Sequence, residues 1–144
     1  MCKKYFYVFY LISIISCNTE DGNLKKGTFK LYEKDVLIGY IYRLENYQVE
    51  EYYEEDAFFA KLNWKDNNTC YIKVLDKEEN RLDSLLFLLK HKKISKYIYE
   101  LKGIPVNSSV DYEYKATLIK ESSKVTKFLD TLKVLNTRYG NGSD

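Results

Sequence analysis

The sequence predicts a mainly β domain. We expect an antiparallel meander of seven or eight strands, forming a curved sheet or a small barrel, together with one helix. Segments with apolar residues at every second position recur along the chain, and short turns separate them. Tyrosine, which favours strands, contributes 15 of the 144 residues, whereas proline occurs once. With 45% hydrophobic and 31% charged residues, the chain has the composition of a globular domain.

The clearest single element is a β-hairpin at residues 57–75. Two segments of alternating polarity flank Asp66-Asn67-Asn68, and Asn and Asp favour turns because they hydrogen-bond their own backbone. The apolar face of this hairpin is expected to carry Phe58, Ala60, Leu62, Trp64, Cys70, Ile72 and Val74. Cys70 is therefore predicted to be a buried, unreactive thiol.

Other segments follow the same two-residue period. Further strands are expected at residues 28–32, 36–43, 47–53, 94–101 and 110–120. Gly39 lies inside the second of these, which suggests a bend or a close approach of a neighbouring strand.

One helix is predicted over about residues 77–91. Asp76 and Glu79 have the spacing of a capping box, and leucines at helical spacing follow them. The stripe consists of Leu82, Leu85, Leu86 and Leu89. Residues 124–135 are ambiguous, because their apolar positions fit a helix slightly better than a strand but fit both.

Residues 1–16 have the features of a signal peptide. Lys3 and Lys4 precede an apolar run of about eleven residues, which is too short to span a bilayer. The sequence Ile14-Ile15-Ser16-Cys17 resembles the lipobox of bacterial lipoproteins. This resemblance implies cleavage between Ser16 and Cys17 and lipidation of Cys17. The alternatives are a simple secretory peptide and an anchor that is not cleaved.

Four regions are therefore expected: a signal peptide at 1–16, a lipidated cysteine and tether at 17–26, a β-rich domain at 27–136 and a flexible tail at 137–144. The resemblance implies a cell-envelope protein, lipid-anchored at the outer membrane, with the periplasmic or surface face left open. Thr19-Glu20-Asp21 resembles the acidic signal that directs some lipoproteins of Bacteroidetes to the cell surface, and an ordinary acidic linker is the alternative.

Charge and cysteine content exclude several classes of function. Without Lys3 and Lys4, the 23 basic residues become 21, which equals the number of acidic residues. Such a balance does not indicate a nucleic-acid partner. Cys70 would be the only thiol left after signal cleavage and lipidation, so no internal disulfide is expected.

Residues 27–75 contain a series of short motifs: Gly27-Thr28-Phe29-Lys30, Ile41-Tyr42-Arg43, Gln48-Val49-Glu50, Leu62-Asn63-Trp64-Lys65-Asp66 and Thr69-Cys70-Tyr71. In their order and spacing, these motifs resemble those of a group of small exported lipoproteins of Flavobacteria and other Bacteroidetes. In this group a helix is followed by three more strands, so the resemblance implies a strand at residues 124–135. Some members carry a label that mentions DNA topoisomerase IV, which this sequence does not support because it has no phosphate-binding loop. The resemblance supports a fold and a compartment but supplies no catalytic residue, and no cofactor is expected.

Few residues suggest chemistry. His91 is the single histidine and is expected to be a solvated cation at the end of the predicted helix. No set of residues has the spacing of a metal site. An acidic cluster could in principle support carboxylate chemistry, but it is expected to be a solvated strand face and turn. It comprises Glu50, Glu51, Glu54, Glu55 and Asp56.

Aromatic residues are the remaining candidates for a binding site. Aromatic side chains stack on ligands, although packing within the sheet is the commoner role. The candidate ligand-facing residues are Trp64, Tyr97, Tyr99, Tyr112 and Tyr114.

Three functional hypotheses follow. The first is a non-catalytic binding or structural module of the cell envelope, held at the membrane by its lipid and contacting a protein or small molecule. The second is a lipocalin-like carrier of a small apolar ligand. A large closed cavity lined by Phe58, Trp64, Tyr112 and Tyr114 would favour the carrier, and a helix that fills the concavity would exclude it. The third, which the pattern supports least, is an enzyme that uses the acidic cluster.

Overall fold

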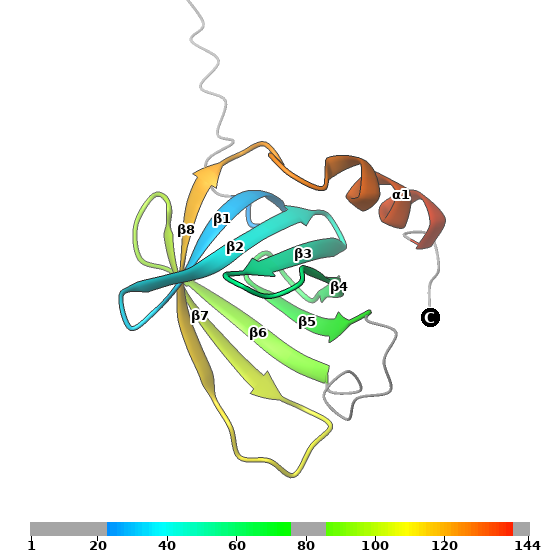
Figure 1. The fold of residues 1–144 in the computed structure, drawn as a ribbon. Helices are drawn as coiled ribbons and strands as arrows, with labels where there is room; N and C mark the ends of the chain where they lie inside the picture. The colour runs from blue at the N-terminus through cyan, green and yellow to red at the C-terminus, as the bar shows by residue number, and fades with distance from the viewer. Residues whose placement is uncertain (1–22, 76–85, 140–144) are drawn as a thin grey trace, which may run out of the picture.

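The computed structural model describes residues 23–75 and 86–139, in which eight antiparallel strands close into a barrel and a helix follows the last strand (Figure 1). Each strand pairs with its neighbour in the chain, and β8 pairs with β1 to close the barrel. The elements are β1 (Lys26–Glu33), β2 (Val36–Leu44), β3 (Tyr47–Tyr52), β4 (Phe58–Trp64), β5 (Thr69–Val74), β6 (Leu86–Lys93), β7 (Ile98–Pro105), β8 (Tyr114–Ser122) and α1 (Leu129–Tyr139). The predicted antiparallel barrel is confirmed.

The hairpin predicted at residues 57–75 is formed by β4 and β5. Leu62 pairs with Ile72, and Trp64 pairs with Cys70. The backbone nitrogen of Asn68 donates a hydrogen bond to Oδ1 of Asp66 at 2.7 Å, as expected for an Asp-initiated turn. The prediction that Cys70 is buried is also confirmed.

The helix predicted over residues 77–91 is wrong for its C-terminal part. Residues 86–91 belong to β6, which pairs with β5 on one side and β7 on the other. The run from Leu86 to Leu89 suits a strand with neighbours on both edges as well as it suits a helix, and closure of the barrel supplies both neighbours. Residues 77–85 lie outside the described residues.

The prediction of a strand at residues 124–135 is also wrong. The chain forms α1 instead, and this helix continues to Tyr139, beyond the predicted domain boundary at residue 136. Because β8 already pairs with β1, the closed barrel leaves no free edge for another strand. Leu129, Leu132 and Leu135 lie about one helical turn apart on α1. Their side chains pack against the outer surface of the barrel.

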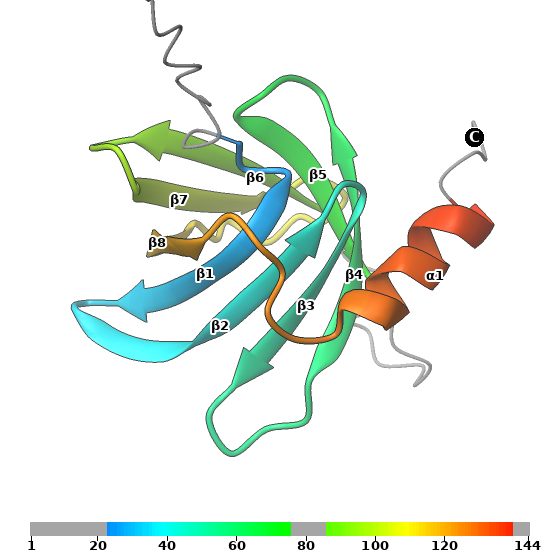
Figure 2. The ribbon, with the colours of Figure 1, turned by 90° about the horizontal axis from the view of Figure 1, so that it is seen from above.

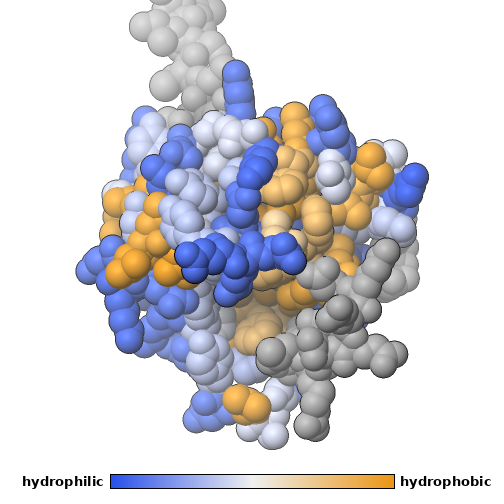
Figure 3. All heavy atoms as spheres, viewed as in Figure 1, coloured by the Kyte–Doolittle hydropathy of each residue, from blue (hydrophilic) through white to orange (hydrophobic). Residues whose placement is uncertain are grey.

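Helix α1 covers an apolar outer face of β2 and β3. It packs outside the barrel against these two strands, as Figure 2 shows. Tyr42, Tyr47 and Val49 form a buried cluster with Leu132 beneath the helix. The opposite faces of the same strands, which point into the barrel, carry polar residues such as Arg43. Figure 3, viewed as Figure 1, shows apolar residues at the surface on the side of the barrel where α1 lies.

The close approach predicted at Gly39 is confirmed. A Cβ atom at this position would lie 2.4 Å from the carbonyl oxygen of Glu51 on β3, so no larger residue fits without a shift of the backbone. In the described ranges, none of the helices has the length and apolarity required to cross a membrane.

Candidate functional site

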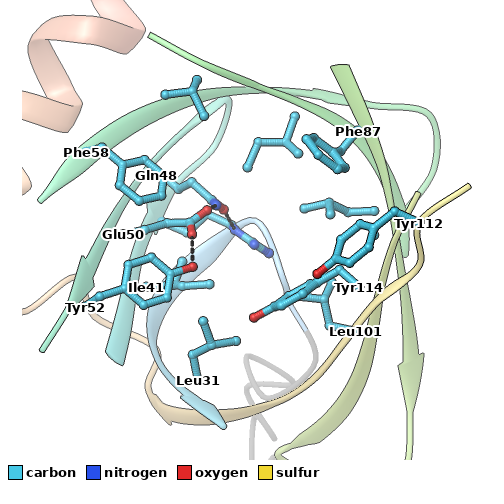
Figure 4. A pocket seen from close by; sticks show the side chains of 15 residues that line it. Leu31, Ile41, Gln48, Glu50, Tyr52, Phe58, Phe87, Leu101, Tyr112 and Tyr114 are labelled. Atoms are coloured by element: carbon cyan, nitrogen blue, oxygen red, sulfur yellow. Dashed lines mark hydrogen bonds between the residues drawn. The ribbon is translucent and has the colours of Figure 1, made fainter. Parts of the chain in front are cut away.

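The interior of the barrel contains a cavity of about 230 Å³ (Figure 4). Its walls are mostly apolar, and its polar side chains come chiefly from β2 and β3. The lining residues are Leu31, Ile41, Arg43, Gln48, Glu50, Tyr52, Phe58, Ile72, Val74, Phe87, Leu89, Leu101, Gly103, Tyr112 and Tyr114. An apolar cavity with a few polar groups is the arrangement typical of small-molecule sites.

Arg43 is the fully buried cation of this cavity. Its guanidinium carbon lies 5.4 Å from the ring centroids of both Phe29 and Trp64, within the range of a cation–π contact. Nη1 donates a hydrogen bond to the carbonyl oxygen of Leu24 at 3.0 Å, and Nε donates to Oε1 of Gln48 at 2.9 Å. Nη2 is buried and has no hydrogen-bond partner among the described residues.

A chain of hydrogen bonds continues from Arg43 to a buried carboxylate. Nε2 of Gln48 donates to Oε1 of Glu50, and the hydroxyl of Tyr52 donates to Oε2 of Glu50 at 2.7 Å. Figure 4 shows these side chains on one wall of the cavity, while Phe87 and Leu101 lie on the other. Both oxygens of Glu50 therefore accept a hydrogen bond, and Gln48 bridges the buried cation and the buried anion.

Burial and charge act on the ionisation of this network. Burial raises the pKa of Glu50, and the hydrogen bonds from Tyr52 and Gln48 together with the charge of Arg43 partly offset this rise. Burial likewise lowers the pKa of Arg43, and the carboxylate of Glu50 opposes the change. Burial and the nearby Glu50 raise the pKa of Tyr52, which stays a neutral donor.

His91 is buried inside the barrel and does not lie at a solvated helix end, so the prediction for this residue is wrong. It is on β6 and is only 4% exposed. Its ring lies 5.9 Å from that of Trp64, centroid to centroid. The cause of the error is the strand at β6, whose alternation turns His91 into the barrel with Leu89.

The five aromatic residues predicted to face a ligand are separated by the fold. Tyr112 and Tyr114 line the cavity. Trp64 is half-buried and packs against Arg43, Tyr99 is buried in the core, and Tyr97 is 42% exposed. None of these last three is among the lining residues.

The acidic cluster is not brought together as one site. Glu50 points into the barrel, so the expectation that it lies on a solvated face is wrong. Glu51 lies on the outer face, where it accepts hydrogen bonds from Tyr42 and Lys127. Glu54, Glu55 and Asp56 are exposed in the turn after β3.

Sequence reasoning missed Arg43 and Gln48 as site residues, although both belong to the quoted motifs at 41–43 and 48–50, and it considered Glu50 only as a member of the acidic cluster. A signal was present. Tyr42, Leu44, Tyr47 and Val49 make the alternate face of these strands apolar, and an apolar outer face needs a cover. A C-terminal helix with a leucine stripe could supply that cover, which would have placed the polar face inside.

Comparison with protein-family models, with curated proteins and with solved structures finds no match for this chain. Among the described residues, no three His, Cys, Asp or Glu side chains are grouped so that they could hold a metal ion. Ser16 and Cys17 lie outside the described residues.

Proposed function

We propose that this protein is a lipid-anchored, non-catalytic carrier of the bacterial cell envelope and that its barrel binds a small, mainly apolar molecule. The observation that carries the proposal is the cavity of about 230 Å³ inside the barrel. Helix α1 packs on the outside and leaves the interior unfilled. Of the three hypotheses from the sequence, the carrier is the one that this arrangement favours.

The size of the cavity limits the ligand. An engineered apolar cavity of about 150 Å³ binds benzene, so a cavity of about 230 Å³ suits a molecule of roughly nine or ten non-hydrogen atoms. Isoleucine, leucine, valine and phenylalanine side chains provide most of the walls, and burial of apolar surface against them would drive binding.

Ligand titration of the full chain tests the carrier function. We expect isopropylbenzene, a compact apolar probe, to shift the NMR signals of residues that line the cavity. Val74 lines the cavity near the end of β5, whereas its neighbour Lys73 is exposed on the opposite face of the same strand. Val74→Trp should fill the space and weaken binding about tenfold or more, while Lys73→Trp should leave binding unchanged.

Two results would contradict the carrier function. One is a set of signal changes confined to the outer surface of the barrel. The other is a Val74→Trp protein that is folded and still binds the probe as tightly as the Lys73→Trp protein does. Far-UV circular dichroism of both variants supplies the control for folding.

The envelope location rests on the sequence around Cys17. Membrane anchoring through acyl chains on this residue would place the barrel at the surface of the bilayer. Intact mass and detergent partitioning of the expressed protein test this part separately. We expect the wild type to carry lipid and to enter the detergent phase, and we expect Cys17→Ala to do neither. The anchor would be contradicted if both proteins were equally soluble and differed in mass only by the substituted side chain.

A further inference from the structure

The polar groups of the cavity define the chemistry of its ligand more narrowly than its size does. We propose that the ligand carries one uncharged hydrogen-bond acceptor, such as a ketone, ester or amide carbonyl, which binds Nη2 of Arg43. This inference rests on the proposed carrier function and names the ligand class of the same cavity.

Nη2 of Arg43 is a buried hydrogen-bond donor without an acceptor among the described residues. Arg43 lines the cavity and is fully buried, and two of its three nitrogens already donate hydrogen bonds, to Leu24 and Gln48. Nη2 has no partner among the residues that the structure describes. A buried donor without an acceptor costs free energy, because it has lost its hydrogen bonds to water. A ligand that places an acceptor at Nη2 would remove this cost.

The charged residues of the cavity limit the charge that a ligand can carry. Among the lining residues, the charged pair consists of Arg43 on β2 and Glu50 on β3, joined through Gln48. The other titratable groups that line the cavity are the phenols of Tyr52, Tyr112 and Tyr114. Both oxygens of Glu50 accept hydrogen bonds, which favours the carboxylate form, and a carboxylate at this place balances the charge of Arg43. A ligand carboxylate would place a second anion beside Glu50 in a desolvated site, whereas a neutral acceptor adds no charge.

Glu50 does not accept a hydrogen bond from Nη2 of Arg43. Its two oxygens accept hydrogen bonds from Gln48 and Tyr52, which hold the carboxylate on its own wall of the cavity (Figure 4). The aromatic rings of Phe29 and Trp64 each lie 5.4 Å from the guanidinium carbon, and these contacts restrict the movement of the group. Nη2 is consequently a positioned donor and not a freely moving one.

Three probes of nearly the same shape test the proposal: isopropylbenzene, which has no acceptor; acetophenone, which has a neutral carbonyl; and benzoate, which is an anion. Their dissociation constants are measured by calorimetry with the full chain at neutral pH. We expect acetophenone to bind more tightly than benzoate. We also expect the affinity of acetophenone relative to isopropylbenzene to fall about tenfold when Arg43 is removed.

The variants are designed to keep the charge of the interior balanced. Arg43→Met alone would leave Glu50 without its counter-ion, so it is combined with Glu50→Gln. Arg138→Met, an exposed position on α1, is the matched control and should change no affinity. The infrared band of the acetophenone carbonyl, measured with the wild-type protein, is independent of any variant. It should lie at lower frequency than in an apolar solvent, because the carbonyl accepts a hydrogen bond.

Each outcome has a defined meaning. If none of the three probes binds, the carrier function itself fails, and the ligand class fails with it. If the probes bind but the carbonyl band is that of an apolar solvent, or the double variant keeps the preference for acetophenone, the cavity is a carrier site and the acceptor proposal is overturned. Tighter binding of benzoate than of acetophenone also overturns it, in favour of an anionic ligand.

Discussion

Nδ1 of His91 lies 2.9 Å from the carbonyl oxygen of Asn68, across the turn that joins β4 and β5. A carbonyl oxygen only accepts hydrogen bonds, so Nδ1 carries the hydrogen and donates it. Burial and the charge of Arg43 lower the pKa of His91 to about 3, although the bond to Asn68 acts in the opposite direction. His91 is thus a neutral imidazole held between the turn and the core of the barrel.

The first prediction concerns the stability of the protein in acid. The unfolded chain takes up a proton on His91 near pH 6.5, whereas the folded chain does so only near pH 3. Protonation between these values favours the unfolded state, so the contribution of His91 to stability is complete above pH 6.5 and is lost as the pH falls. We expect urea unfolding at pH 4 to 7 to show a steeper decline for the wild type than for His91→Gln. Parallel curves would contradict the neutral, buried state of His91.

The second prediction concerns the contact between α1 and the barrel. Leu132 is fully buried against Tyr42, Tyr47 and Val49, whereas Val134 on the same helix is 47% exposed. Leu132→Ala should lower the free energy of unfolding by about 3 kcal/mol, because it leaves a cavity beneath the helix. Val134→Ala should change it by less than about 0.5 kcal/mol. Equal effects in urea unfolding would mean that α1 does not pack on β2 and β3 as described.

The third prediction compares two neighbouring carboxylates on opposite faces of β3. Glu50→Ala removes the counter-ion of the buried Arg43 and should lower the free energy of unfolding by about 3 kcal/mol. Glu51 pairs with Lys127 near the surface, so Glu51→Ala should cost about 1 kcal/mol or less. Thermal and urea unfolding of the two variants measure the difference. A larger effect at Glu51 than at Glu50 would contradict the assignment of the inner and outer faces.

The fourth prediction concerns the reactivity of Cys70. Burial raises the pKa of its thiol to about 11, so little thiolate is present at pH 8 and access is blocked. Iodoacetamide should modify Cys70 slowly in the folded protein and rapidly in urea, as read by peptide mass spectrometry. A cysteine introduced at the exposed turn residue Asn67 should react at once under both conditions. Equal rates at positions 67 and 70 in the folded protein would contradict the burial of Cys70.

The polar interior of the barrel explains why the site could not be predicted in full. In β3, Gln48, Glu50 and Tyr52 alternate with Tyr47 and Val49. Such alternation shows that the two faces differ, but it does not show which of them points to water. The usual assignment places the polar face outside, and here it is reversed because α1 covers the apolar face.

The two helix errors have one physical origin. Leu86 to Leu89 and the segment around Leu132 each satisfy a helical and an extended pattern, so local periodicity does not distinguish the two states. The first segment became a strand because β5 and β7 provide partners on both edges. The second became a helix because the barrel has no free edge among the described strands and because β2 and β3 present an apolar outer face.

The sequence by itself determined the class of the fold. Alternating polarity, turn residues at Asp66-Asn67-Asn68 and the close approach required by Gly39 are local properties, and local interactions suffice to specify strands, turns and hairpins. The burial of Cys70 followed from the same alternation.

Only the tertiary structure decided which residues form the interior. Closure of β8 onto β1 and the packing of α1 on β2 and β3 bring together positions that are distant in the chain. These contacts turn Arg43, Gln48 and Glu50 towards the cavity and bury their charges and hydrogen bonds there. Whether a polar strand face meets water or a cavity depends on what covers the opposite face, and that cover comes from a helix about 80 residues later in the chain.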